Sequence, residues 1–372
     1  MIYADHAATT KLSAKARDAM QIWQEEEYGN PSTLCAIARK PRAAIADARG
    51  IIARAIGAKP NEIFFTSGGT EADNWALKGM AFMYPGQKKR IVTSEIEHHA
   101  VLNTCAFLEM LGYEVVYLPV DRYGLVSSIE LEKAITDDTV LVSIMMANNE
   151  VGTIEPIAEL AETAHRCGVP FHTDAVQALG HVPININGLN IDMLSASAHK
   201  FNGPKGTGFL YVKSGVKLHP LLHGGGQENS MRSGTENVGG IVGMGAALQE
   251  HMDTMQQDAD RLEALRSMLI ALLRKAGLDF IVNGSERHIP GSLSVSFRGV
   301  QGEMLLHRLD LMNIAVATGS ACNSKETTLS HVIKALKIPS EYANGTIRIT
   351  LGMDNDEEQI KAMADSIVRI IG

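Results

Sequence analysis

The sequence has little of several features that mark specialised classes of protein. Of its 372 residues only four are cysteine, and no CxxC pair occurs, so neither a disulfide framework nor a zinc knuckle is indicated. No uninterrupted apolar run approaches the roughly eighteen residues of a membrane-spanning helix. The N-terminal residues lack the basic head and apolar block of a signal peptide, and we therefore expect a cytoplasmic protein.

Positive charge is also scarce. The 34 lysines and arginines are outnumbered by 42 aspartates and glutamates, which gives a formal net charge of −8, and the basic residues are dispersed along the chain. This distribution supports neither a nucleic-acid-binding stripe nor a basic membrane patch, so we expect neither partner. Apolar residues make up 45% and charged residues 20% of the chain, a composition typical of a folded protein with two domains or one large core.

Strand-like and helix-like patterns alternate through the first two thirds of the chain. Helical patterns at 41–56 and 99–111 each end at a glycine, Gly57 and Gly112. This alternation predicts an α/β fold with a mostly parallel sheet of seven strands that is covered by helices on both faces. The predicted strands are 62–66, 90–93, 114–119, 139–147, 169–173, 191–195 and 207–212.

The pattern changes after residue 240. Residues 240–275 read as one or two helices that form a connector. Beyond them, short strands alternate with helices, which predicts a smaller α+β domain. The strands are 293–297, 314–317 and 346–351, and the helices are 303–311, 330–336 and 356–371. We expect a large domain of residues 13–255 and a small domain of residues 1–12 and 256–372.

Polar residues gather directly after the predicted strands, where ligands bind in open α/β sheets. The segment Ser67-Gly68-Gly69-Thr70 joins a strand to a helix, so its N–H groups and hydroxyls could bind a phosphate at the positive end of the helix. A simple capping turn is the alternative, and the segment lacks the Gly-Lys-Ser/Thr of an ATP-binding loop.

Lys200 follows another apolar strand, with Ser197 and His199 beside it. An ammonium at the end of a buried strand must be paired, solvated or used chemically, and the use that fits is a Schiff base with a carbonyl cofactor. Pyridoxal phosphate also needs an acid against its ring nitrogen, and Asp174 ends a strand upstream. A surface salt bridge and a helix cap are the simpler roles for Lys200 and Asp174. Together with a phosphate-binding turn, however, the two residues supply three requirements of one cofactor.

Histidine and cysteine residues add further candidates. His98 and His99 follow a strand. The imidazole of one of them could stack on a planar ring or carry protons, and the other histidine would simply start a helix. No histidine or cysteine spacing of metal-binding type occurs, so we expect no metal site.

Among the cysteines, Cys105 and Cys167 lie in apolar helical patterns and are expected to be inert core residues. Cys322 lies in a segment rich in small and polar residues, which suits a nucleophile, although an exposed cysteine without function is the alternative.

With these residues in view, the whole chain resembles the cysteine desulfurases of the nitrogen-fixation and iron–sulfur-cluster type, fold-type I pyridoxal-phosphate enzymes of the class V aminotransferase superfamily. Any one of the matching motifs is weak evidence, but ten in the same order are highly specific. They are YADHAATT at 3–10, GNPS at 29–32, TSGGTE at 66–71, EH at 97–98, NNEVG at 148–152, HTDAVQ at 172–177, SAHK at 197–200 with GPKG at 203–206, RSGT at 232–235, GSAC at 319–322 and IR at 347–348.

The resemblance implies a role for each matching residue. Lys200 would hold pyridoxal 5′-phosphate through its amine, Asp174 would pair with the ring nitrogen, and His98 would stack on the ring. The remaining cofactor contacts would come from Gly69, Thr70, Ser197 and His199 at the phosphate, Gln177 at the phenolic oxygen and Asn149 beside cofactor and substrate. Arg348 would bind the substrate carboxylate, for which a planar bidentate cation is well shaped. Thr235 would reach the phosphate of the neighbouring subunit, which implies a homodimer.

The implied reaction removes sulfur from L-cysteine and leaves L-alanine and a persulfide on Cys322, with Lys200 and His98 as the other catalytic residues. A sulfur-acceptor protein, such as an iron–sulfur scaffold or a transfer-RNA thiolation protein, would then take the sulfur. A selenocysteine lyase, another class V enzyme or a catalytically lapsed sulfur-relay scaffold are the alternatives.

Three departures from the family pattern occur. Cys35 occupies the stretch where a histidine is common, and it either packs or provides a second thiol near the site. Ala198 replaces the usual glycine before His-Lys, and His6-Ala7 replaces two asparagines. None of these departures removes a catalytic group.

Overall fold

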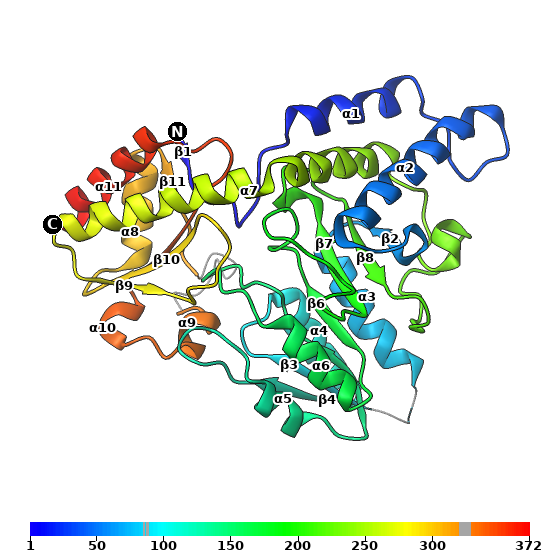
Figure 1. Ribbon diagram of the computed structural model, residues 1–372, viewed down its shortest axis with the longest axis horizontal. Coiled ribbons are helices and arrows are strands. Elements are labelled where there is room, and N and C mark those ends of the chain that lie inside the picture. The colour runs from blue at the N-terminus through cyan, green and yellow to red at the C-terminus, as the bar shows by residue number, and fades with distance from the viewer. Residues whose placement is uncertain (85, 87–88, 320–328) are drawn as a thin grey trace.

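A seven-stranded sheet forms the centre of the larger of two lobes in the computed structural model, which describes residues 1–84, 86, 89–319 and 329–372. The smaller lobe holds both ends of the chain, and a single long helix, α7 (Val238–Lys275), runs along both lobes (Figure 1). Within the described part of the chain, no helix combines the length and apolar character needed to cross a bilayer.

The large sheet has the strand order β2-β8-β7-β6-β5-β3-β4. All neighbouring pairs are parallel except those made by β8, which is antiparallel to β2 and β7, so the predicted mostly parallel sheet of seven strands is confirmed. The strands are β2 (Ile63–Thr66), β3 (Arg90–Ser94), β4 (Glu114–Leu118), β5 (Thr139–Ser143), β6 (Phe171–Asp174), β7 (Met193–Ser197) and β8 (Gly208–Val212).

Strand β5 ends at Ser143 and is shorter than predicted, although Ile144 and Met146 still donate their N–H groups to the carbonyl oxygens of His172 and Asp174 in β6. The backbone N–H of Met145 donates to the carboxylate of Glu97 at 2.9 Å. Residues 144–147 remain buried, so hydrophobicity alone could not mark where the strand ends.

Helices cover both faces of this sheet, as the sequence predicts. Successive side chains of a strand point to opposite faces. In β7, Met193 packs with the helices α3 (Gly69–Met83) and α4 (His99–Met110), whereas Leu194 packs on the opposite side. That opposite face is covered by α2 (Arg39–Ile56), α6 (Ile157–Arg166) and the first half of α7. The remaining helices of this lobe are α1 (Ala14–Glu25) and α5 (Ser128–Ala134).

The smaller lobe contains an antiparallel sheet of order β12-β10-β9 and a parallel pair of β1 with β11. Strand β9 was not expected from the sequence, because it is short and most of it is only partly buried. The elements are β1 (Ile2–Tyr3), β9 (Phe280–Asn283), β10 (Ser292–Phe297), β11 (Ile314–Ala315), β12 (Thr346–Thr350), α8 (Gly302–Leu311), α9 (His331–Ala335), α10 (Ser340–Ala343) and α11 (Glu357–Ile371).

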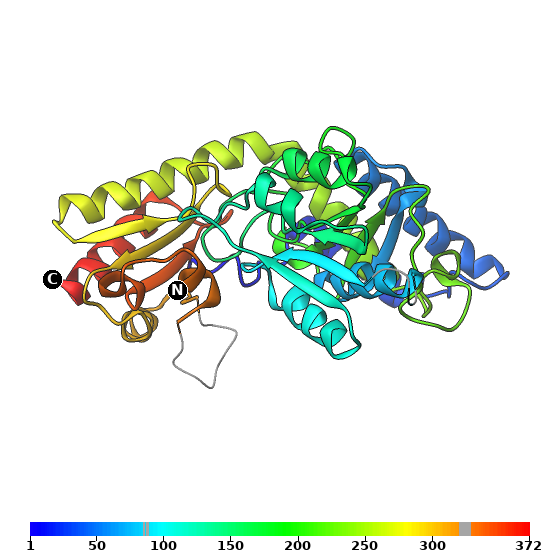
Figure 2. The same cartoon turned by 90° about the horizontal axis from the view of Figure 1, so that it is seen from below.

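Helix α7 is continuous over 38 residues, which decides between the one or two helices expected for this region. Its first half buries Ile241, Met244 and Leu248 in the core of the large lobe. Its second half packs into the core of the small lobe, where α11 lies beside it (Figure 2). The predicted boundary near residue 255 falls inside this helix, and the division into two domains stays a prediction.

The prediction that Cys167 is an inert core residue is wrong. Cys105 is buried as expected, but Cys167 is exposed. It is the C-cap residue of α6, and the chain turns away at Gly168, whose φ is +71°. The apolar pattern that suggested burial therefore ends one turn before the cysteine, at Ala164.

Replacing Leu269 by alanine is expected to destabilise the protein, because Leu269 is fully buried where α7 meets the small lobe. The loss of buried apolar surface and the cavity left behind should lower the free energy of unfolding by about 2–5 kcal/mol. Denaturant unfolding of Leu269→Ala measures this loss. Ser267→Ala, an exposed position on the same helix, is the matched control. Equal stability of the two variants would contradict the packing described here.

Candidate functional site

A cavity of about 570 Å³ lies at the carboxyl ends of the parallel strands and is lined by residues of both lobes. Most of the predicted site residues line it: Gly69, Thr70, His98, Asn149, Asp174, Gln177, Ser197, His199, Lys200 and Arg348. Thr235 is exposed and does not line this cavity. Cys322 lies outside the described residues, although the described Gly319 lines the cavity.

The turn before α3 is shaped by glycine and held by an acid. A Cβ atom at Gly69 would lie 2.5 Å from Cγ2 of Val176, so only glycine allows this close approach of the turn to the next loop. The carboxylate of Glu71 accepts the N–H of Ser67 at 2.8 Å and pairs with Arg232, also at 2.8 Å. Burial alone would raise the pKa of Glu71, but the hydrogen bonds from Arg232 and Ser67 outweigh it and lower that pKa. The turn is thus fixed at the positive end of a fifteen-residue helix.

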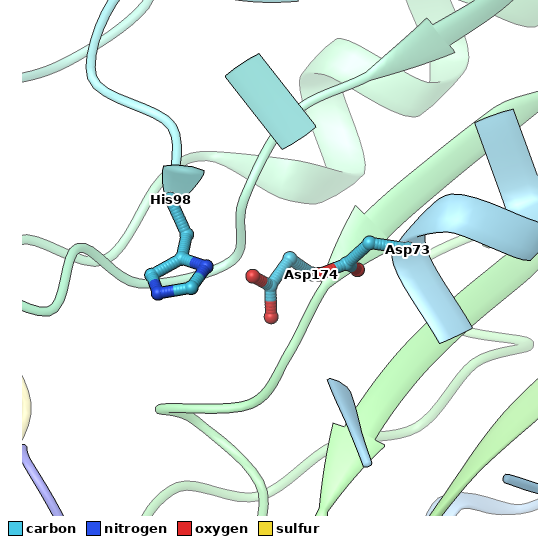
Figure 3. Close-up of side chains that lie close together, drawn as sticks. All are labelled: Asp73, His98 and Asp174. Carbon is cyan, nitrogen blue, oxygen red and sulfur yellow. The ribbon is translucent and has the colours of Figure 1, made fainter. Parts of the chain in front are cut away.

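Asp174 presents its carboxyl group to the cavity from the end of β6. Its Oδ1 accepts the N–H of Val176 at 2.8 Å. Figure 3 shows this carboxyl between the ring of His98 and the side chain of Asp73. One ring nitrogen of His98 and one carboxylate oxygen of each aspartate lie within 4.8 Å of one another. Burial raises the pKa of Asp174, whereas His98, Val176 and Lys200 act in the opposite direction.

The ring of His98 is oriented by the start of α4. As the N-cap residue it accepts the N–H of Ala100 on Nδ1 at 3.1 Å, so its neutral form carries the proton on Nε2. Burial lowers the pKa of His98, which favours this neutral form. His99 begins the helix itself, and its ring lies 5.1 Å from that of His331. The structure thus gives the two histidines different places, one as the N-cap residue and the other as the first residue of α4, which the sequence alone could not decide.

Lys200 is surrounded by backbone acceptors. Its Nζ donates to the carbonyl oxygens of Ala7 and Ala8, the latter at 3.0 Å. The same N-terminal segment is held by Gln177, whose side chain donates to the oxygen of Ala7 at 3.0 Å. Behind the lysine, His181 donates to its carbonyl oxygen at 2.9 Å. The two bonds from Nζ to the oxygens of Ala7 and Ala8 compensate the cost of placing an ammonium at a partly buried position.

His199 lies beside this lysine. Its Nδ1 is 3.0 Å from the hydroxyl of Thr9. Burial, together with the charges of Lys200 and Lys205, lowers the pKa of His199 to about 4. The imidazole is therefore neutral at pH 7, and it can bind an anion only as a hydrogen-bond donor.

Arg348 faces the same cavity from β12 in the small lobe and is buried. Its Nη2 binds the carboxylate of Asp5 at 2.6 Å, and its Nη1 donates to the carbonyl oxygen of Asn149 at 2.9 Å. The Nε atom has no hydrogen-bond partner among the described residues. Asn148 fixes this region, because its side chain accepts the N–H groups of Glu150 and Val151.

Four buried or half-buried acids at or near the site were not predicted from the sequence: Asp5, Asp73, Glu97 and Glu150. Glu97 accepts hydrogen bonds from Ser94 and Met145, and burial raises its pKa to about 8. Glu150 accepts the hydroxyl of Ser330 at 2.6 Å, and burial raises its pKa to about 7. Asp5, Glu97 and Glu150 lie within the matching motifs, but nothing in those motifs indicates a buried acid, and Asp73 is a single acid in a helical pattern.

Comparison with known proteins places this site in a family. The model of the family described as "Aminotransferase class-V" matches residues 2–363. The chain belongs to the class V aminotransferase family. It is 50% identical over 371 residues to a protein named cysteine desulfurase IscS from Dictyoglomus turgidum, covering all of this chain and 94% of that protein. A protein of the same name from Methanosarcina thermophila is 48% identical over 370 residues, covering all of this chain and 92% of its relative.

Solved structures of the family have the same fold. A structure described as "NifS-like protein" superposes with a TM-score of 0.94 at 39% identity, covering all of this chain and 99% of the other. One described as "SspA in complex with cysteine" gives a TM-score of 0.85 at 38% identity and covers 94% of this chain and 99% of its own. Both bear out the predicted relationship to NifS-like class V enzymes and their fold.

Replacing Glu97 by glutamine is expected to change how stability depends on pH. The carboxyl has a pKa of about 8 in the folded protein and 4.5 as its ordinary value. Between these values only the folded form keeps the proton, so the contribution of Glu97 to stability falls as pH rises, by about 1.4 kcal/mol per pH unit.

Denaturant unfolding of wild type and Glu97→Gln at several pH values between 5 and 8 measures this difference. The variant should lose less stability than wild type across that window. Glu25→Gln removes an exposed carboxylate on α1 and is the matched control, with a slope equal to that of wild type. A Glu97→Gln slope that equals the wild-type slope would show that Glu97 releases its proton well below pH 8.

Proposed function

We propose that this protein is a pyridoxal-phosphate-dependent cysteine desulfurase that converts L-cysteine to L-alanine and keeps the sulfur as a persulfide on Cys322. The observation that carries the proposal is that one cavity brings together Lys200, Asp174 and Arg348 in a chain whose full-length relatives are named cysteine desulfurases. The lysine and the acid meet needs of the cofactor, and the arginine meets a need of an amino acid substrate.

The residues around the cavity fit pyridoxal phosphate. The turn at the N-terminus of α3 favours glycine at position 68, where φ is +148°, and its backbone N–H groups at the start of the helix would bind the phosphate. Thr70, Ser197 and the neutral His199 supply hydrogen-bond donors there. Asp174 would pair with the ring nitrogen, Gln177 with the phenolic oxygen, and Lys200 would hold the carbonyl carbon. When bound, the cofactor supplies an electron sink for the substrate carbon that carries the amino group.

The remaining residues would bind the substrate and move protons. Arg348 would bind the carboxylate of cysteine through its guanidinium, and Asn149 would line the same end of the cavity. The amine of Lys200 would take the proton from the substrate Cα. His98, with its proton on Nε2, would stack on the ring and could pass a proton to the leaving group.

The sulfur step balances without a further reactant. The thiolate of Cys322 attacks the sulfur of the substrate, a sulfur–sulfur bond forms, and the bond between that sulfur and Cβ breaks. The electron pair of the broken bond goes to the substrate carbon, which is protonated to the methyl group of alanine. The carbon is thereby reduced, and the two sulfur atoms are oxidised to the persulfide level.

We further propose that the enzyme is a homodimer and delivers sulfur to an acceptor protein in iron–sulfur cluster or transfer-RNA sulfur metabolism. The support for a dimer is the placement of Thr235, which is exposed and separate from the cavity of its own chain. A residue that binds phosphate from that position would have to do so in a second subunit.

Replacing Cys322 by serine is expected to abolish sulfur transfer and to leave cysteine binding intact, because only the nucleophile is lost. Alanine release should fall at least about a hundredfold, and mass spectrometry should find no added sulfur. The protein should still be yellow with bound cofactor and change its visible spectrum on addition of cysteine. Cys35→Ser, which alters an exposed thiol, is the control and should keep wild-type turnover.

Other results with this variant, or with wild type, would favour the alternative functions. Alanine production by the Cys322→Ser protein at the wild-type rate would indicate a lyase that acts without a persulfide. A faster reaction of wild type with selenocysteine and none with cysteine would indicate a selenocysteine lyase. A wild-type protein that takes up no cofactor would indicate a lapsed scaffold.

Replacing Asp5 by alanine is expected to weaken substrate binding, because Asp5 holds the guanidinium of Arg348 in place at 2.6 Å. The KM for cysteine should rise roughly tenfold while kcat changes little, since the lost contact orients a binding group. Steady-state kinetics separate the two constants. Asp5→Asn keeps an acceptor for the guanidinium and should recover part of the affinity. An unchanged KM in both variants would show that Arg348 needs no support from Asp5.

A further inference from the structure

Asp73 lines the cavity next to Asp174 and has no part in the function described above. It is on α3, four residues after Gly69, and only 1% of it is exposed. Its side chain points toward the carboxyl of Asp174 (Figure 3). Its Oδ1 has no hydrogen-bond partner among the described residues and lies 3.8 Å from Nε2 of His172.

The groups that face Asp73 provide no positive charge to balance an anion. From β6 comes His172, which is fully buried, and burial lowers the pKa of that imidazole to about 3. Its Nδ1 and Nε2 contact the hydroxyls of Ser143 on β5 and Ser195 on β7, at 2.8 and 2.9 Å. His172 is therefore neutral at pH 7, and its two hydrogen bonds are to uncharged groups.

The other titratable neighbours are acids and one more neutral histidine. Asp174 and Glu97 face Asp73 with carboxyl groups, and the negative charge of each would raise its pKa, in addition to burial. His98 contributes a ring nitrogen within 4.8 Å, but burial lowers the pKa of that ring too. Ser195 hydrogen-bonds Asp73 and acts in the opposite direction.

Two carboxyl groups in one buried site cannot both be ionised without a large cost, so one keeps its proton. Asp174 has the better support for a negative charge, because it accepts the N–H of Val176 at 2.8 Å and Lys200 faces it. Among the residues that the structure describes, one oxygen of Asp73 has no hydrogen-bond partner and no cation faces the group. The proton therefore belongs on Asp73.

We propose that Asp73 is an uncharged positioning residue, a carboxylic acid at the wall of the cavity that supports the ionised carboxylate of the neighbouring Asp174. The inference deepens the proposed function and depends on it for the partner of Asp174, which is the ring nitrogen of the cofactor. An uncharged Asp73 leaves Asp174 as the single anion beneath the ring. An ionised Asp73 would compete with Asp174 for the proton that the ring nitrogen needs.

Infrared spectroscopy of the purified protein tests the protonation of Asp73 directly. The difference between wild type and Asp73→Asn should contain the carbonyl band of a protonated carboxylic acid, which shifts in heavy water, at pH 7 and at pH 9. Glu97→Gln is the matched control, because the corresponding band of Glu97 should fade from wild type as pH rises through about 8. A difference spectrum that contains only carboxylate bands would overturn the proposal.

Cofactor binding tests the positioning role. Asparagine is uncharged and of the same shape, so Asp73→Asn should bind pyridoxal phosphate within about twofold of wild type and keep the pH at which the visible band of the bound cofactor changes. Asp73→Ala should bind it roughly tenfold more weakly, because the support for Asp174 is lost. A shift of that pH by one unit or more in Asp73→Asn, or wild-type affinity in Asp73→Ala, would contradict the role.

The two measurements separate this inference from the proposed function. If wild-type protein binds no pyridoxal phosphate, the proposed function fails, and the infrared band still decides where the proton lies. If wild type binds the cofactor and the acid band is absent, the function stands and the inference about Asp73 fails. The infrared arm and the binding of Asp73→Asn remain decisive if Asp73→Ala does not fold.

Discussion

A single negative charge in a buried position is the constraint on which the site depends. Under the proposed function, Asp174 must stay ionised at the end of a buried strand, where desolvation opposes ionisation. The backbone N–H of Val176 and the charge of the facing Lys200 favour this ionisation. Buried acids nearby that have no such support, such as Glu97, keep their protons at neutral pH because burial raises their pKa.

The parts of the fold that repeat a simple pattern could be predicted from the sequence. The seven strands of the large sheet came from apolar runs, and the helices between them from periodic patterns that end at glycine. The cavity-lining residues followed from one rule, that ligands bind beyond the carboxyl ends of parallel strands. Lys200 and Asp174 could be found in this way because each lies at or shortly after the end of a strand.

Other features could not be predicted because they depend on contacts between distant segments. Just past the end of β5, the N–H of Met145 donates to Glu97, which is 48 residues away in the sequence. Asp5 binds Arg348, which is 343 positions away in the sequence, so no local pattern indicates that the two residues form a pair. Asp73 is one polar residue on a buried helix. Only the folded structure shows that His172 and Asp174 lie next to it and that it could act on the site.

The N-terminal segment and α7 connect the two lobes at separate places. The chain passes from β1 in the small lobe to the carbonyl oxygens of Ala7 and Ala8 at Lys200, and it returns through the unbroken helix α7. Because two connections join the lobes, the lobes can move relative to each other less freely than lobes joined by one flexible linker. The distance between the guanidinium of Arg348 and the amine of Lys200 is thereby limited from both sides. Under the proposed function, that separation would suit α-amino acids, in which one carbon carries both the amino group and the carboxylate.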